Sequence, residues 1–170
     1  MKFVIRTIKI IDKISETVGK SISFLILFMV FIDFTEVVLR YFFGHPTAWS
    51  WEVATYLYGA NFVLAGGWAL KEGKHVRTDI LYDKLSQRWR AIFDLFTFST
   101  IFLLFCGVLT FLTVKAAIFS VSIVEYSYTM NRIPIFPLKV AIAVGFSLLL
   151  LQGVAKIARD IIFLAKGEVV

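Results

Sequence analysis

Cysteine and histidine are scarce in this chain of 170 residues, and each scarcity excludes a class of function. A single cysteine, Cys106, permits neither an intrachain disulfide nor a cysteine-rich metal cluster. Two histidines, His45 and His75, are too few for a diheme cytochrome or a histidine-rich zinc site. The sequence also has no phosphate-binding glycine motif and no serine–histidine–carboxylate arrangement. We therefore expect no catalytic site, no metal and no cofactor, and a protein that is not an enzyme.

Charged residues are also few. They make up 18% of the chain, against the roughly 25% that is usual in soluble domains. Hydrophobic residues make up 59%, and the mean hydropathy is +0.81. A soluble fold of this length cannot bury so much apolar surface in one core. The composition predicts an all-α integral membrane protein.

Four apolar segments are each long enough to cross a bilayer, which takes about 20 residues as a helix. They cover about residues 21–43, 51–70, 91–113 and 138–164, and no breaker stops the third before residue 124. Pro134 and Pro137 stand just before the fourth segment, where a helix can begin but not continue. We expect residues 21–170 to form a four-helix transmembrane domain.

Lysine and arginine are unevenly distributed between the two sides of this arrangement. Of the 18 in the chain, 14 fall in the N-terminal segment, in the loop after the second span and in the C-terminal part. Basic residues are retained on the cytoplasmic side, so both termini and the middle loop are predicted to be cytoplasmic. The net charge of +6 is thus a signal of topology, and we expect no nucleic-acid partner.

Residues 1–20 have the pattern of an amphipathic helix. Their basic side chains repeat at intervals of three, four or seven and share one helical face: Lys2, Arg6, Lys9, Lys13 and Lys20. Such a helix is expected to lie in the cytoplasmic interface, held by apolar burial and by anionic lipids. Alternatively, it is the stem of the first span. The following apolar run continues into Asp33 with no small-residue cleavage pattern, so we expect an uncleaved span.

The first span contains three charged residues on one helical stripe, Asp33, Glu36 and Arg40. Glu36 and Arg40 are four residues apart and can pair. Ionisable groups at membrane depth mark a functional stripe, either a proton or cation site or a contact between helices. Because Arg40 neutralises part of the charge and the stripe lies in the outer half of the span, the sequence favours the helix contact.

In the second span, Glu52, Gly59 and Gly66 recur at heptad spacing and therefore share a face. Small residues on such a face let a second helix approach closely. Asn61 lies on the opposite side and needs a partner of its own. Tyr41 and Trp49 flank the two spans in the manner of the aromatic belts at membrane surfaces.

A polar stretch, KEGKHVRTD, follows the second span at residues 71–79. Gly73 permits a turn there, and Asp79 is placed to cap a short following helix. His75 either makes hydrogen bonds within this loop or docks onto a partner, and both interpretations stay open.

Several of these features together resemble a known family. The features are RYFF at residues 40–43, Trp49 with Glu52, the pair His75 and Asp79, and the prolines Pro134 and Pro137. They are similar to motifs of the small membrane subunit, of DctQ type, of tripartite ATP-independent periplasmic (TRAP) transporters. One departure is Trp51, where many members have a second acidic residue beside Glu52, and this puts any role of an acidic pair in doubt.

The resemblance implies a place in a bacterial or archaeal cytoplasmic membrane and two protein partners. One is a large DctM-type membrane subunit that carries the sodium and substrate sites. The other is a periplasmic solute-binding protein that delivers an organic acid anion. The small subunit would be a scaffold without a substrate site of its own. The alternative from the residues alone is a small proton-coupled exporter that acts as a homo-oligomer, with Asp33 or Glu36 as its coupling acid.

Overall fold

The computed structural model describes residues 2–73 and 86–166, and this part of the chain is helical. Its helices are α1 (Lys2–Ser23), α2 (Leu25–Phe42), α3 (Ser50–Lys71), α5 (Gln87–Thr97), the π-helical turn η1 (Phe98–Phe102), α6 (Leu103–Ser122) and α7 (Phe136–Lys166). Within the described ranges, β-structure is limited to one isolated bridge between Tyr126 and Pro134. The expected all-α class is confirmed.

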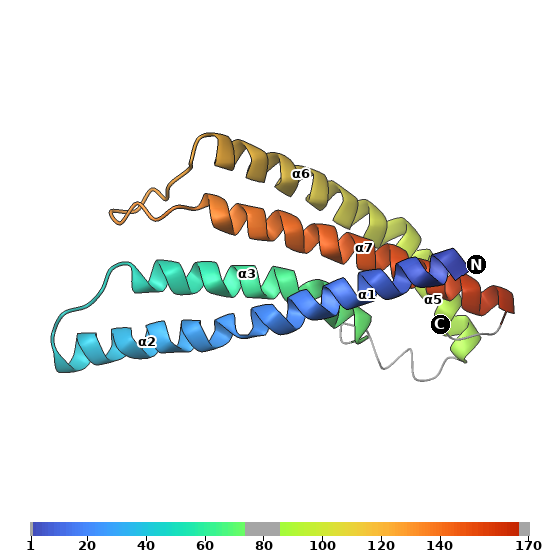
Figure 1. Ribbon diagram of the computed structural model, residues 1–170, viewed down its shortest axis with the longest axis horizontal. Coiled ribbons are helices and arrows are strands. Elements are labelled where there is room, and N and C mark those ends of the chain that lie inside the picture. The colour runs from blue at the N-terminus through green and yellow to red at the C-terminus, as the bar shows by residue number, and fades with distance from the viewer. Residues whose placement is uncertain (1, 74–85, 167–170) are drawn as a thin grey trace.

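The helices lie side by side along one long axis (Figure 1). We call one end of the molecule the terminal end, because α1 begins and α7 ends there. The opposite end, here the loop end, holds the α2–α3 connection (residues 43–49) and the α6–α7 connection (residues 123–135). Gly44 and Gly73 have φ angles of 65° and 66°, a left-handed conformation that ends α2 and α3 at little steric cost. The turn expected at Gly73 is therefore present.

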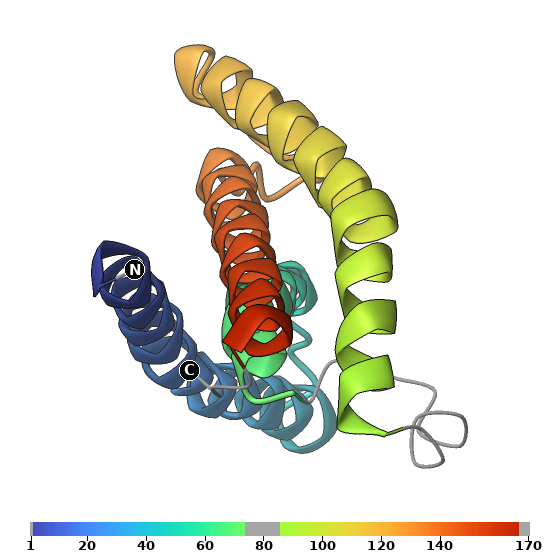
Figure 2. The same cartoon turned by 90° about the vertical axis from the view of Figure 1, so that its right-hand side faces the viewer.

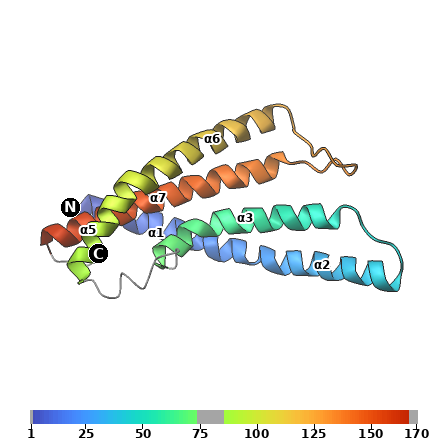
Figure 3. The same cartoon turned by 180° about the vertical axis from the view of Figure 1, so that it is seen from behind.

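α1 and α2 follow one another almost in line, with a single break at Phe24 (Figure 3). Just before this break, the Ser23 hydroxyl donates a 2.8 Å hydrogen bond to the Gly19 carbonyl, a bond of the kind that bends helices. The Asn61 amide of α3 donates a 2.8 Å bond to the Ile22 carbonyl at the same point. This bond supplies the partner that the sequence required for Asn61, and it ties the bend to α3.

α3 and α7 occupy the centre of the molecule. Viewed along its length, α1 and α2 lie on one side of this pair, and α5, η1 and α6 lie on the other (Figure 2). α7 packs on α3 and α6, and α3 packs on α1, α2 and α7. The two central helices approach closely at Gly145 of α7, where an added β-carbon would lie 2.8 Å from the carbonyl carbon of Val63.

The turn η1 joins α5 to α6 without a break in the helical path. Such wider turns shift the register of a helix by one residue. Here the turn places Phe102 directly over Gly153 of α7, where a β-carbon would lie 2.2 Å from the Phe102 ring. The rings of Phe98 and Phe102 are 4.8 Å apart. The sequence showed no breaker in this stretch and did not predict the turn.

Three helical stretches are long and apolar enough to cross a membrane: Phe3–Phe42, Ile92–Ser122 and Phe136–Ala165. The first is longer than expected because α1 continues into α2, and the third span reaches Ser122. α3 is not among them, so the count of four spans is not confirmed. Its glycines and its Glu52, Thr55 and Asn61 lower its hydropathy, and neighbouring helices cover most of its circumference.

The contact between α3 and α7 predicts a specific sensitivity to side-chain size. Gly145→Ala should lower the free energy of unfolding by about 1–3 kcal/mol, because the new methyl group overlaps the Val63 backbone. The matched control is Gly107→Ala in α6, where nothing lies within 4 Å of the added carbon. That substitution should be neutral or stabilising, since alanine favours helix over glycine. Thermal unfolding in detergent compares the two variants, and equal midpoints would contradict the close crossing.

Candidate functional site

Most of the ion pairs among the described residues lie toward the two ends of the bundle. At the loop end, Glu36 of α2 accepts hydrogen bonds from the Arg40 guanidinium at 3.0 and 2.6 Å. Its second oxygen accepts bonds from the Thr47 backbone amide, at 2.9 Å, and from the Thr47 hydroxyl. The Glu36 side chain is 12% exposed. The expected pair of Glu36 and Arg40 therefore forms, and Thr47 extends it to fasten the α2–α3 connection onto α2.

Glu52 joins α3 to the α6–α7 connection. It lies in the first turn of α3 and is 7% exposed. One carboxylate oxygen accepts a 2.8 Å hydrogen bond from the Tyr56 hydroxyl, and the other accepts a 2.7 Å bond from the Thr129 hydroxyl. A buried carboxylate needs such donors, because desolvation of the charge is otherwise costly. Glu52 thus holds together segments that are 77 residues apart.

The α6–α7 connection is a short hairpin with two residues in the left-handed conformation. Val124 and Arg132 have φ angles of 47° and 46°, which are uncommon for side chains with a β-carbon. The Ser127 amide donates a 2.8 Å bond to the Ile133 carbonyl, and the Tyr126–Pro134 bridge adjoins it. These contacts give the hairpin one defined shape.

Glu125 anchors the base of this hairpin. Its carboxylate accepts a 2.5 Å bond from the Lys139 ammonium of α7, and its backbone amide donates a 3.0 Å bond to the Ser120 carbonyl of α6. The Lys139 hydrogen bond lowers the pKa of Glu125 below its ordinary value, although burial opposes this. The residue thus links the end of α6 to the start of α7.

At the terminal end, α1 is fastened to α7 by a buried polar chain. The Ser15 hydroxyl donates a 3.1 Å hydrogen bond to the Gln152 side-chain oxygen, and both residues are almost fully buried. The Gln152 amide donates a 2.8 Å bond to Asp12, which also pairs with Arg159. Apolar packing adds Ile8, which is 3% exposed. Hydrogen bonds, an ion pair and apolar packing therefore hold α1 against α7.

Lys71 and Lys156 form further ion pairs at the terminal end. Lys71 at the end of α3 reaches Glu16 of α1 at 2.6 Å. Lys156 of α7 lies 2.6 Å from Asp160 on the same helix and 2.9 Å from Asp94 of α5. Each of the helices α3, α5 and α7 thus contributes a charged partner to this end, so the bundle is fastened at both ends by pairs of opposite charge.

The glycines of α3 that the sequence predicted as helix-contact residues do not make the closest contacts. Gly59 and Gly66 both face α7, but their nearest neighbours are Leu138 and Leu149 side chains at ordinary contact distances of 3.6 and 3.8 Å. The glycines that permit the closest approaches are instead Gly19, Gly145 and Gly153.

The remaining candidates lie at the loop end or outside the described part. Tyr41 is 78% exposed and Trp49 is 46% exposed. Pro134 forms the bridge to Tyr126, and Pro137 is the second residue of α7, where proline is well tolerated. His75 and Asp79 lie outside the described residues.

Sequence reasoning missed the polar partners at both ends. Some of them carried a signal, since Lys156 and Asp160 are four residues apart and can pair on one side of a helix. The others lie far apart in the sequence, so that no local spacing points to them: Asp12, Ser15, Glu16, Asp94, Thr129 and Gln152.

The arrangement of these side chains suits a structural role, holding helices together, better than a catalytic or metal-binding role. In the described ranges, no three histidine, cysteine, aspartate or glutamate side chains gather closely enough to hold a metal ion. The carboxylates Glu36, Glu52 and Glu125 each accept hydrogen bonds from hydroxyl, amide or cationic donors.

Comparison with family models gives a match to the DctQ component of tripartite ATP-independent periplasmic transporters over residues 29–162, more than three quarters of the chain.

The chain belongs to the DctQ family. The resemblance noted in the sequence is thereby confirmed, and the protein is a small permease subunit of a TRAP transporter and a multi-pass membrane protein. The DctQ family is one of transporter components and not of enzymes. Comparison with curated proteins found no match. The matched range begins within α2 and therefore leaves out α1, whose attachment to the bundle is a feature of this structure.

The lowered pKa of Glu125 predicts a pH dependence of stability. Its contribution should be complete above the pKa of the unfolded chain, about 4.3, and should be lost as the pH falls through the lower folded value. Glu125→Gln should therefore lower the unfolding temperature at neutral pH, and the difference from wild type should shrink under acid. Glu72→Gln is the control, because Glu72 is exposed and 3.8 Å from its nearest cation. A difference that is constant with pH would contradict this role.

The buried hydrogen bond between Ser15 of α1 and Gln152 of α7 predicts that substitutions at these two positions have non-additive effects on stability. Gln152→Leu should cost about 1–3 kcal/mol, because it leaves the buried Ser15 hydroxyl without its acceptor. Adding Ser15→Ala should recover part of this loss, since removing both partners is less costly than removing one. Chemical denaturation of the two single variants and the double variant measures the coupling. Full additivity would show that the two side chains do not act together.

Proposed function

We propose that this subunit is the fixed scaffold of a sodium-coupled importer of an organic acid anion. In this proposal a larger polytopic subunit carries the ion and substrate sites, and a periplasmic binding protein delivers the solute. The observation that carries the proposal is the family match, together with a bundle whose helices are tied at both ends by charged side chains. A scaffold has to keep its shape while a neighbouring part moves, and such fastening meets that need.

The surface chemistry of the chain supports a substrate site elsewhere. A groove of about 520 Å³ lies between α6 and α7, and apolar side chains such as Val114, Val121 and Leu148 form most of its wall. An organic anion needs cationic or hydrogen-bonding groups to replace its hydration, and this groove offers only Ser122 and Ser147.

The hairpin at the loop end is a candidate contact for the binding protein. Tyr128 and Met130 at its tip are fully exposed, while Thr129 between them is bound to Glu52. Exposed aromatic side chains on a rigid support are well suited to protein recognition, because little conformational entropy is lost on binding. The distribution of basic residues supports an orientation with the loop end on the periplasmic side and both termini in the cytoplasm.

In the same orientation α1, which continues almost in line into α2, would bring its N-terminal end to the cytoplasmic surface of the inner membrane. Part of its surface is used by the bundle, through Ser15 and Ile8. Lys9 and Lys13 are exposed and free to contact anionic lipid headgroups. We therefore keep anionic lipid as a proposed partner of this helix, in addition to its contacts with α3 and α7.

The alternative of a self-sufficient proton-coupled exporter has less support. Its coupling acid would have to be a carboxylate that can exchange protons in a water-filled path. Glu36 is engaged by Arg40 and Thr47. Asp33 lies exposed on the outside of α2, away from any path through the interior of the bundle.

The proposal is tested by purification in mild detergent and by reconstitution. The tagged chain should bring down one large polytopic protein in stoichiometric amount. Liposomes that contain both subunits, supplied with the binding protein, should take up an organic acid anion only in an inward sodium gradient. The matched control is liposomes that contain the small subunit alone, which should show no flux. Proton-coupled efflux by the chain alone, or its recovery only as a self-associated oligomer, would overturn the proposal in favour of the exporter.

A further inference from the structure

One side of the central helix α3 is left uncovered by the other described helices. Trp51, Tyr58 and Phe62 are 78%, 61% and 70% exposed, and their spacing of seven and four residues puts them on one stripe. The rings of Tyr58 and Phe62 stack with their centroids 6.4 Å apart. The other sides of α3 are covered by α1, α2 and α7. The stripe is therefore a gap in the packing around a central helix.

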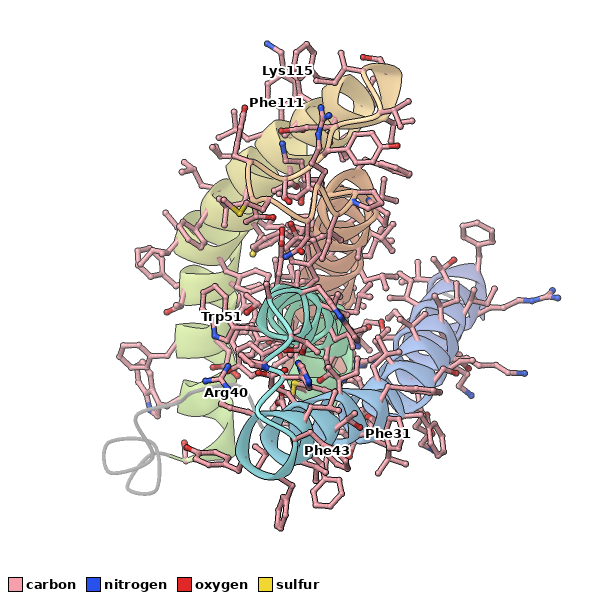
Figure 4. All side chains as sticks on the ribbon, turned by 90° about the vertical axis from the view of Figure 1, so that its left-hand side faces the viewer. Phe31, Arg40, Phe43, Trp51, Phe111 and Lys115 are labelled. Carbon is pink, nitrogen blue, oxygen red and sulfur yellow. The ribbon has the colours of Figure 1, made fainter. Side chains whose placement is uncertain are left out.

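The neighbouring helix α2 continues this surface. Arg40 and Trp51 extend toward the same side of the molecule, whereas Phe31 lies on the other side of α2 (Figure 4). Asp33 precedes Arg40 by seven residues and so shares its side of the helix. We call these residues together the open face: Asp33, Arg40, Trp51, Tyr58 and Phe62.

Asp33 is the chemically unusual member of the open face. It lies at the middle of α2, about 12 Å from either end, with apolar residues before and after it. It is exposed, and no described residue makes a hydrogen bond or an ion pair with it. The nearest basic residue along the helix, Arg40, is bound to Glu36. Lipid tails offer no donor, so a carboxylate at this depth needs one from another protein.

We propose that the open face binds a transmembrane helix of the large subunit, and that this helix presents a cationic or hydrogen-bonding side chain to Asp33. This inference rests on the proposed function for the identity of the partner. The aromatic stripe supplies the apolar contact area, and Asp33 fixes the depth at which the helix binds.

A second copy of this chain fits the open face less well. Paired with itself, the face would offer Asp33 only Arg40, which is already engaged by Glu36. The exposed Lys115 of α6 points elsewhere (Figure 4), so a contact between Asp33 and Lys115 would join two different surfaces. Contacts of that kind build rings or open chains instead of a closed dimer. A helix of a different protein avoids both difficulties.

The test uses two phenylalanines that are equally exposed on different sides of the molecule. A photo-reactive benzophenone amino acid replaces Phe62 on the open face, 70% exposed, or Phe31 on the far side of α2, 69% exposed. Each version of the full chain is co-expressed with the large subunit of the same transporter and irradiated in membranes. We expect a covalent product with the large subunit from position 62 and none from position 31.

The other outcomes separate the two proposals. A product with the large subunit from position 31 only, or from neither position while the unmodified chain still co-purifies with that subunit, would overturn the open face as the binding surface. A product from position 62 that contains two copies of the chain would overturn the choice of partner. Failure of the unmodified chain to bind any large subunit would instead overturn the proposed function.

A second measurement addresses Asp33 itself. Asp33→Leu should lower the recovery of the large subunit about tenfold, which corresponds to the loss of one hydrogen bond to a charged group. Phe31→Leu is the matched control on the same helix and should leave the recovery unchanged. Because Asp33 makes no hydrogen bond or ion pair with any described residue, the variant should keep its own amount and thermal stability in the membrane. Normal recovery of the large subunit with Asp33→Leu would overturn the role of the carboxylate.

Discussion

The backbone of Val63 in α3 lies against Gly145 of α7 so closely that no β-carbon fits between them. Lipid provides little hydrophobic drive for two helices to associate, so their packing depends on close contact and on polar side chains between them. Once α7 lies on α3, its Gly153 receives Phe102, which sets the position of α6. Its Gln152 reaches Ser15, which sets the position of α1. Both outer layers of the bundle are thus positioned from one crossing.

The carboxylates at the two ends keep this crossing in place. Glu52 reaches the hairpin at the loop end, while Asp12 and Asp94 reach the basic residues of α7 at the terminal end. The pairs of Asp94 with Lys156 and of Asp12 with Arg159 join different helices, so sliding or rotation of one helix would separate opposite charges. At the loop end, the same movement would break the hydrogen bond between Glu52 and Thr129. A shape that is held at both ends in this way suits a subunit whose role is to support a moving neighbour.

The outer surface of the bundle is mainly apolar, in contrast to the polar contacts that join the helices. α2 has no buried residue, and most of its large apolar side chains are exposed, as are many on α6. Lipid covers such side chains without cost, so most of them need no partner. Asp33 differs because no lipid tail can satisfy a carboxylate. Beside it, the aromatic stripe of α3 belongs to a helix whose other sides are all covered.

The sequence by itself determined the helical membrane class, the family, and those contacts that lie within one helix or one turn. The pair Glu36 and Arg40 and the turn at Gly73 are of this kind, because the spacing of a helix or the conformational freedom of glycine settles them. The three-dimensional arrangement decided which helices cross at a glycine. Gly59 and Gly66 had the expected heptad spacing, yet Gly145 and Gly153 make the close contacts, because helix crossings depend on angles that no local pattern records. It also decided the partners of Glu52, Asp12 and Ser15, whose hydrogen bonds join positions 77 to 147 residues apart and form only when the bundle is assembled.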